Sequence, residues 1–238
     1  MLATAIAHAN IAFVKYWGRR DDELNLPLND SISMNLSNAI TRTTVSFDSS
    51  YKEDEVIING KPASEKARER VVKFLNLVRE LAGVDEKCKV VSENNFPTGC
   101  GIASSASAGA ALALACCASL GLPTNESFVS RLARRFSGSA SRSVPPGFVR
   151  WKASDEDEQS FAFSIAPPNH WKLCDVVAVI SEEHKKVSSH EGHTLAKTSP
   201  FLEARVKDAS KRVEIVEKAI LEKDIVTLGQ EIERDAIS

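Results

Sequence analysis

Residues 94–117 of this 238-residue chain read NNFPTGCGIASSASAGAALALACC. A strand-like run, Cys88 to Val91, precedes them, and one proline and two glycines then form a loop in which a strand cannot continue. The Ala- and Leu-rich residues that follow predict a helix beginning near Ala103–Ser105. Small residues allow close approach of a ligand, and the free N–H groups of a first helical turn point towards it. The stretch therefore predicts an anion site, and phosphate is the obvious anion.

A tight turn before a buried packing helix would also account for the glycines. Ser104, Ser105 and Ser107 favour a ligand site, because a packing helix does not need hydroxyls in its first turn. The spacing matches neither the P-loop, which ends in Gly-Lys-Ser/Thr, nor the dinucleotide-binding Gly-x-Gly-x-x-Gly.

The composition is that of an ordinary soluble globular protein, with 43% hydrophobic and 26% charged residues. A net charge of −2 gives no reason to expect nucleic acid or an anionic membrane as a partner, so local clusters must bind any anionic substrate. The sequence shows neither a signal-peptide pattern nor an apolar run of membrane-spanning length. Five cysteines without zinc spacing suit a reducing compartment, and we expect a cytoplasmic protein.

The N-terminal part predicts β-structure. Residues 4–17 read as a strand, a turn and a second extended piece, and 31–36 and 40–47 as two alternating strands. Lys15 lies in an apolar run, so it needs a partner or must extend to the surface. The nearby Tyr16, Arg19 and Arg20 favour a polar partner at that end.

Two helices and a second small-residue loop follow. Residues 64–82 have helical periodicity, and Arg70 beside the apolar stripe reads as a solvated arginine. Thr124 is the expected N-cap of a helix ending near Phe136. Residues 137–143 place Arg142 among serines, which suits a second phosphate or a carboxylate. A flexible linker is the weaker interpretation, because strand-like residues 147–151 follow at once.

The C-terminal part predicts one strand and two helices. The apolar run 174–180 is typical of a strand buried on both faces, and helices are expected over 200–221 and from Asp224 to Ser238. His190 and His193 are three residues apart, but no third ligand has a suitable spacing, so we expect no metal site there.

These motifs resemble those of the diphosphomevalonate decarboxylase family of the GHMP kinase superfamily. The matching segments begin at Asn10 (NIAFVKYWGRRD), Leu26 (LPLNDSIS), Asn95 (NFPTGCGIASSA) and Ser137 (SGSASRS), with weaker matches near Lys186 and Thr198. Together they cover nearly the whole chain in the family's order. The Asn-Ile-Ala-x-x-Lys-Tyr-Trp-Gly motif is the most specific, because many GHMP kinases share the Ser-Ser-Ala loop.

The resemblance implies an α+β, two-lobed GHMP kinase fold. The N-terminal lobe, residues 1–170, would resemble domain 2 of ribosomal protein S5 and contain a left-handed βαβ unit, against the usual handedness. Residues 171–238 would begin a ferredoxin-like C-terminal lobe that is incomplete here.

The resemblance also implies an activity: ATP-dependent decarboxylation of mevalonate 5-diphosphate to isopentenyl diphosphate, through phosphorylation of the 3-hydroxyl, in isoprenoid synthesis. Lys15 and Arg142 would be the catalytic residues of this segment. The substrate would contact Tyr16, Trp17, Gly18, Arg19, Arg70, Ser137, Gly138, Ser139, Ala140, Ser141, Arg142, Ser189 and His190. ATP with Mg²⁺ would contact Pro97, Thr98, Gly99, Cys100, Gly101, Ile102, Ala103, Ser104 and Ser105. The magnesium would arrive with ATP and lie near Ser105, and the longer protein could be a homodimer.

Several residues depart from the family pattern. The family's required aspartate would lie beyond Ser238, so this chain is expected to be an inactive fragment. Pro145-Pro146-Gly147 replaces Gly-Gly, Arg150 stands where an acidic residue is common, and His190 and His193 also differ. The last difference leaves mevalonate 3,5-bisphosphate open as the substrate. The sequence is also compatible with a GHMP small-molecule kinase and with a non-catalytic phosphate-binding module.

Overall fold

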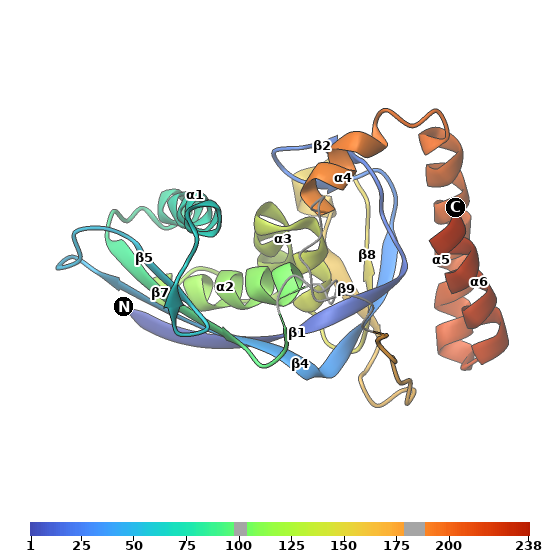
Figure 1. Ribbon diagram of the computed structural model, residues 1–238, viewed down its shortest axis with the longest axis horizontal. Coiled ribbons are helices and arrows are strands. Elements are labelled where there is room, and N and C mark those ends of the chain that lie inside the picture. The colour runs from blue at the N-terminus through green and yellow to red at the C-terminus, as the bar shows by residue number, and fades with distance from the viewer. Residues whose placement is uncertain (98–103, 179–188) are drawn as a thin grey trace.

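The computed structural model describes residues 1–97, 104–178 and 189–238 and contains a seven-stranded sheet, a small two-stranded sheet and helices (Figure 1). The strands are β1 (Leu2–Val14), β2 (Arg19–Asp21), β3 (Leu26–Pro27), β4 (Ser31–Asp48), β5 (Glu55–Ile58), β6 (Lys61–Pro62), β7 (Lys87–Asn94), β8 (Phe148–Trp151) and β9 (Ala162–Ala166). The helices are α1 (Glu65–Ala82), α2 (Ser104–Leu120), α3 (Glu126–Phe136), α4 (Ser189–Ala196), α5 (Leu202–Glu222) and α6 (Ile225–Ile237), with 3₁₀ turns η1 (Gly138–Ser143) and η2 (Asp157–Gln159).

The long strands β1 and β4 form the spine of the main sheet. β1 pairs with both halves of β4, while β7 and β8 pair with successive halves of β4. The predictions of two strands in residues 31–47, and of a turn within residues 4–17, were therefore wrong. The register shifts between His8, which pairs with Ile40, and Asn10, which pairs with Asn35. Residues 36–39 of β4 form a bulge there, and the backbone pairing continues on either side of it.

One βαβ unit is present: β5 and β7 pair in parallel and α1 connects them. The predicted helix boundary is confirmed, since Ser64 is the N-cap of α1 and Gly83 takes the left-handed conformation at φ 67° that ends a helix. The N-cap of α3, by contrast, is Asn125 and not Thr124. The Asn125 side chain accepts a hydrogen bond from the Phe128 N–H at 3.0 Å, which satisfies a donor of the first turn.

Helix α2 lies at the centre of the larger core. It packs on β1 and β4 and against α3 and η1, and most of its residues from Ala106 to Cys117 are buried. Its buried residues are mostly Ala, Gly and Cys because α2 lies between the sheet and the layer formed by α3 and η1, where larger side chains do not fit. A Cβ on Gly109, for example, would lie 2.9 Å from that of Ala140. This packing holds the start of α2, where the predicted anion loop ends.

A second core joins α5 and α6 to the other end of the sheet, where both helices contact β1 and α5 also contacts β4 and β9; Figure 1 shows the two helices side by side at that end. Val213, Val216 and Ile220 of α5 pack in one cluster with Phe13 of β1 and Phe148 of β8. The amphipathic helices predicted over 200–221 and 224–238 are confirmed, and Asp224 caps α6 by accepting from the N–H groups of Val226 and Thr227.

The predicted strand over 174–180 is not formed in its described part. Residues 174–178 are outside any strand and exposed, and Val176 is 90% exposed. A strand is stable only when a neighbour satisfies its backbone groups, and no described strand pairs with this segment. Residues 179–180 lie outside the described part. Among the described residues, no helix combines the length and the apolar character needed to cross a bilayer.

Arg150 on β8 links the sheet to α5. Its guanidinium contacts Asp30 at 2.7 Å, Glu217 at 2.7 Å and Glu214 at 2.8 Å. Burial lowers the pKa of the Arg150 guanidinium, but hydrogen bonds to the three carboxylates outweigh it and raise the pKa overall. The departure from the family at this position therefore has a structural explanation, because a cation here neutralises a half-buried acidic cluster.

Replacing Arg150 by methionine is expected to lower the free energy of unfolding by about 2 kcal/mol, because the carboxylates lose their counter-ion in a half-buried place. Arg20→Met is the matched control, since the pair that Arg20 forms with Asp155 is exposed and contributes at most about 0.5 kcal/mol. Urea unfolding of both variants measures the difference. Equal, small losses would contradict a role for Arg150 in holding α5.

Candidate active site

The site begins where β1 ends. Beyond Val14, the chain turns so that the buried Tyr16 ring meets Trp151 of β8 edge-on, with ring centroids 4.7 Å apart. On its other side the Tyr16 ring stacks on His193 of α4 at 4.4 Å and an interplanar angle of 16°. Trp17 also packs against His193, at 5.1 Å. Trp151 and His193 thus enclose the Tyr16 phenol, and Trp17 packs on His193.

Arg142 of η1 lies beside this phenol. The residue is only 3% exposed, and its guanidinium carbon is 5.8 Å from the ring centroids of both Tyr16 and Trp151. Its hydrogen bonds are to neutral groups: Nη1 donates to Ser31 Oγ at 2.6 Å and Nη2 to Asn10 Oδ1 at 3.5 Å. Within the described residues, no carboxylate lies within ion-pair distance of Arg142, so this part of the chain gives the buried cation no counter-ion.

The charged groups that act on Tyr16 within the described part of the chain are three arginines. Burial raises the pKa of the Tyr16 phenol, although Arg142, Arg19 and Arg70 each act to lower it. Burial also lowers the pKa of the Arg142 guanidinium to about 10, with Tyr16 acting in the opposite direction. Arg19 also pairs with Asp22 at 3.8 Å, but three arginines near one hydroxyl still make this place favourable for an anion.

The sequence of η1 explains how Arg142 reaches this place. Gly138 has no side chain where the Tyr16 hydroxyl lies, and the Ser141 hydroxyl donates to the Gly138 carbonyl at 2.8 Å. Asn10 of β1 holds the turn from the sheet, because its amide donates to Ser139 O at 3.1 Å and to Ser143 Oγ at 2.7 Å. Among the described contacts, small residues and one buried amide thus fix the arginine, and no acidic side chain takes part.

A cleft of about 250 Å³ adjoins this site. Its apolar lining comes from β5, α1, β7 and α2, and Ser104 and Ser105 lie at the start of α2. Its lining residues are Thr43, Val56, Ile58, Ala67, Arg70, Val71, Val90, Ser92, Asn94, Ser104, Ser105, Ala108, Leu112 and Phe136. An apolar cleft with hydroxyls at a helix N-terminus fits a nucleotide, whose base is flat and largely apolar and whose phosphates are anionic.

Arg70 connects the two places. It lines the cleft, its charge acts on Tyr16, and its guanidinium donates to the Phe136 carbonyl at 2.8 Å while lying 4.3 Å from the ring of Phe136. Desolvation, and next the charge of Arg19, lower the pKa of Arg70, although the residue as a whole is exposed. The interpretation as an exposed helix arginine is confirmed, and the guanidinium in addition binds the Phe136 carbonyl. A phosphorylated ligand in the cleft and an anion beside Arg142 would meet at Arg70.

Two family profiles match the chain. The one described as diphosphomevalonate decarboxylase-like N-terminal domain matches residues 7–162, and the one described as mevalonate 5-diphosphate decarboxylase C-terminal domain matches residues 175–238. The chain belongs to the diphosphomevalonate decarboxylase family.

Curated relatives and solved structures agree with this membership. The diphosphomevalonate decarboxylases of Aspergillus fumigatus and Saccharomyces cerevisiae are each 39% identical over 99% of this chain. The chain spans 63% and 64% of their lengths, just under two thirds. The mevalonate diphosphate decarboxylase structures from Enterococcus faecalis and Staphylococcus aureus have TM-scores of 0.88 and 0.90 at 40% and 36% identity. Each match covers all of this chain and 73% of the other.

A further structural neighbour is described as MDDEF in complex with MVAPP, AMPPCP and magnesium, with a TM-score of 0.88, 40% identity, and coverage of 100% of this chain and 73% of that one. These neighbours have the GHMP kinase fold, which confirms the α+β fold class predicted for this decarboxylase-family chain.

The structure brings together most of the described residues predicted to line the decarboxylase-family site. Tyr16, Arg19, Arg70 and Arg142 converge as described above. Ala140 and Ser141 are fully buried inside η1, where they support the turn, so their contact with substrate stays a prediction. Ser137 and Ser139 lie close together in the same segment, with 3.4 Å between their hydroxyl oxygens.

Part of the predicted nucleotide loop lies outside the described residues. This applies to Thr98, Gly99, Cys100, Gly101, Ile102 and Ala103. Pro97 immediately precedes the gap, and Ser104 and Ser105 begin α2 after it, as predicted. Ser189 and His190 begin α4, and only their backbone is described. No group of three or more His, Cys, Asp or Glu side chains within the described ranges could hold a metal ion.

The contacts of the Lys15 ammonium and of the His193 ring differ from those expected from the sequence. Lys15 is half-buried, and its Nζ lies 3.5 Å from the Ala12 carbonyl, the one hydrogen-bond acceptor that the described residues give its ammonium. His193 was considered as a metal ligand and as a departure from the family that bears on the substrate, yet its ring covers Tyr16. Periodicity could not identify that role, because nothing local in the sequence links residue 193 to residue 16.

Replacing Gly138 by alanine is expected to displace Tyr16 and to weaken anion binding at least tenfold. The new Cβ would overlap the Tyr16 hydroxyl and lie 2.9 Å from Cζ of the same ring and 3.2 Å from Trp151 Cη2. Tyr16 is enclosed by Trp151 and His193 and cannot turn away without a cost of about 1–3 kcal/mol. Calorimetric titration with inorganic pyrophosphate measures the loss.

Gly229→Ala is the control for Gly138→Ala. Nothing lies within 4 Å of a Cβ at position 229 in the interior of α6, so this change is expected to stabilise the protein by roughly 0.5–1 kcal/mol and leave binding intact. Unchanged pyrophosphate affinity in Gly138→Ala would refute the close approach of Gly138 to Tyr16 as a requirement of the site.

Proposed function

We propose that this chain binds mevalonate 5-diphosphate and ATP and provides the arginine site of an ATP-dependent decarboxylase that forms isopentenyl diphosphate. The membership of the family supports the reaction, and the names of relatives and the ligands named for the structural neighbour support the substrate and nucleotide. The single observation that carries the proposal is Arg142, a buried cation that no carboxylate of the described residues neutralises.

An anionic substrate completes such a site. A carboxylate or phosphate oxygen beside Arg142 would replace the water that the guanidinium has lost, and a bidentate contact would also orient the anion. Arg19 and Arg70 act on the same space, so the carboxylate and the diphosphate of the substrate can be held at different arginines. The substrate would then lie with its carboxylate steered by Arg142.

The other residues predicted to contact the substrate are proposed to lie around these arginines. Tyr16, Trp17 and Gly18 form the wall that leaves β1, and Ser137 and Ser139 present hydroxyls from the turn before Arg142. We assign Lys15 to the charge on the reacting end of the substrate, because its ammonium has no carboxylate partner within the described residues. Ser189 and His190 are proposed to contact the diphosphate from α4.

The cleft beside Arg70 is the proposed ATP site. Ser104 and Ser105 at the start of α2 would hold the phosphates, and the apolar residues of α1, β5 and β7 would hold the base. When bound, ATP supplies the phosphoryl group that makes the 3-hydroxyl of the substrate a leaving group. The protein's own contribution is positioning and charge neutralisation, with Mg²⁺ arriving on the nucleotide near Ser105.

Three further features belong to this proposal. A boundary near residue 170 between the two lobes is supported by the family profiles, which match on either side of it. A cytoplasmic location and a homodimer are proposed for the longer protein, to be tested by cell fractionation and light scattering.

The test uses the protein made from the complete gene, incubated with ATP, Mg²⁺ and mevalonate 5-diphosphate. Equal release of carbon dioxide and ADP is expected. ADP without carbon dioxide would replace the proposal by a small-molecule kinase. Release of neither product, followed by turnover of mevalonate 3,5-bisphosphate, would change the substrate, and turnover of neither compound would leave a phosphate-binding module.

A further inference from the structure

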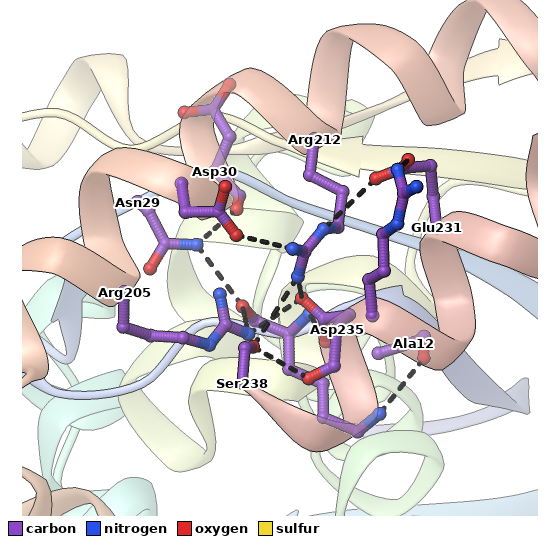
Figure 2. A network of polar contacts seen from close by, with 11 residues as sticks. Ala12, Asn29, Asp30, Arg205, Arg212, Glu231, Asp235 and Ser238 are labelled. Carbon is purple, nitrogen blue, oxygen red and sulfur yellow. Dashed lines mark hydrogen bonds and ion pairs between the residues drawn. The ribbon is translucent and has the colours of Figure 1, made fainter.

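A buried carboxylate of the last helix lies against the start of the substrate site. Asp235 of α6 is 3% exposed, and its Oδ1 accepts from Arg205 at 2.7 Å and lies 3.4 Å from Arg212, both of α5. Figure 2 shows Asp235 between these two arginines. The other carboxylate oxygen, Oδ2, accepts from the backbone N–H of Lys15 at 3.1 Å. One side chain thus joins α5 and α6 to the residue before Tyr16.

The carbonyl of Lys15 is held as well. It accepts from the Asn29 amide at 3.2 Å and from Arg205 Nη2 at 3.4 Å. We call Asp235, Arg205 and Asn29 the Lys15 clamp. Its members come from three separate parts of the chain, and together they satisfy both backbone polar groups of Lys15.

The position of Lys15 explains why side chains take this role. β1 ends at Val14, so the peptide groups of Lys15 have no strand partner, and a buried peptide group without a partner costs about 1–3 kcal/mol. The clamp supplies partners and also fixes the direction in which the chain leaves the sheet. The next residue is Tyr16, whose ring is seated between Trp151 and His193. A small rotation at Lys15 would therefore move the phenol out of the arginine cluster.

We propose that the Lys15 clamp positions Lys15 and Tyr16 for anion binding, with Asp235 as its central positioning residue. The inference rests on the proposed function for the identity of the anion, and on geometry alone for the placement of Tyr16. It connects the C-terminal helices to the site although Asp235 itself is directed at backbone and arginines.

A general structural role is the competing explanation, since Asp235 also ties α5 to α6. Glu231 separates the two explanations. It is 6% exposed, lies one turn earlier on α6, and pairs with the same Arg212 at 3.2 Å, and its hydrogen bonds and ion pairs go to Arg212 and Arg234 and not to Lys15. Loss of either carboxylate removes a buried partner of Arg212, but only loss of Asp235 opens the clamp.

The experiment uses 3-fluorotyrosine labelling and ¹⁹F NMR. The chain contains two tyrosines, Tyr16 and Tyr51, so two signals are expected, and Tyr51→Phe assigns them. In Asp235→Ala we expect the Tyr16 signal to shift and broaden while the Tyr51 signal stays in place. In Glu231→Ala we expect neither signal to move, even where thermal unfolding shows an equal loss of stability.

Titration with inorganic pyrophosphate and mevalonate 5-diphosphate gives the functional readout. Kd is expected to rise about tenfold in Asp235→Ala, as for a displaced hydrogen-bonding group. The Kd of Asp235→Asn should lie between those of Asp235→Ala and the wild type, because the amide oxygen can still accept from the Lys15 N–H. The Kd of Glu231→Ala should stay within twofold of the wild type. If Asp235→Ala does not fold, Asp235→Asn against Glu231→Gln makes the same comparison.

The outcomes separate the inference from the proposed function. Equal effects of the Asp235 and Glu231 variants on the Tyr16 signal and on Kd would overturn the clamp and leave a helix-packing role. A wild-type protein that binds neither anion would refute the proposed function, while the Tyr16 signal in Asp235→Ala would still decide whether the clamp positions that ring.

Discussion

The Arg142→Met protein is expected to bind mevalonate 5-diphosphate at least a hundredfold more weakly than the wild type, yet to unfold at the same or a higher urea concentration. Removing one partner of a desolvated charge pair costs about 2–5 kcal/mol of binding, which corresponds to this loss. Stability should not fall, because no carboxylate of the described residues pairs with this desolvated cation in the free protein, and an apolar side chain of similar length avoids the cost of burying it.

Arg134→Met provides the matched control for this prediction. Arg134 is also fully buried, but its guanidinium pairs with Asp157 and donates to the Ser160 carbonyl at 2.7 Å. We expect this variant to lose roughly 2–3 kcal/mol of stability, because Asp157 loses one of its two arginine partners (Arg131 remains) and the buried Ser160 carbonyl loses its donor, and to keep its affinity for mevalonate 5-diphosphate. Urea unfolding and calorimetric titration of the two variants should therefore give opposite patterns.

Destabilisation of Arg142→Met with unchanged affinity would show that Arg142 is a structural arginine. The assignment of the anion to the Arg142 site would then be wrong, whatever the activity of the complete gene product.

Gly147→Ala is expected to lose roughly 3–4 kcal/mol of stability. Gly147 joins η1 to β8 at φ 85°, a backbone conformation that costs an L-residue about 1–2 kcal/mol. A Cβ there would overlap the Ala166 carbonyl oxygen and lie 2.8 Å from Pro167 C and 2.9 Å from Pro168 N. These are backbone atoms, so β8 and β9 would have to separate to make room, which adds an overpacking cost of about 1–3 kcal/mol.

Gly60→Ala separates the cost of the backbone conformation from the cost of overpacking. Gly60 also has a positive φ, of 75°, but nothing lies within 4 Å of a Cβ at that position. It should lose only about 1–2 kcal/mol for its backbone conformation. Urea unfolding of both variants measures the difference, and equal losses would show that the contact of position 147 with β9 relaxes at little cost.

The helices show what local sequence can predict. The apolar period of α1, the glycine at position 83 and the aspartate cap of α6 each act within one or two turns, so their effect can be read from neighbouring residues. The Gly- and Ser-containing segment before α2 and the Asn-Ile-Ala motif are likewise local, and they were sufficient to predict the family and the GHMP kinase fold.

The strands were harder to predict because their stability comes from partners. The polar residues around Ser37 resemble a break, yet β1 pairs with β4 on both sides of them and keeps the strand continuous. The apolar residues 174–178 resemble a buried strand, yet no described strand pairs with them and they lie exposed. Hydrophobic pattern indicates which residues can form a strand, and long-range pairing decides which do.

By itself, the sequence determined helices α1, α2, α3, α5 and α6, but not α4, and it determined the family and the residue types of the anion site, since propensity, capping and motif spacing act over short distances. Tertiary structure alone decided which of those residues have a counter-ion and which groups hold them in position. It left Arg142 without a carboxylate among the described residues, gave Arg150 three of them, and brought Asp235 to the backbone of Lys15, 220 residues away along the chain. Burial and pairing depend on which distant segments meet, and no local pattern records that.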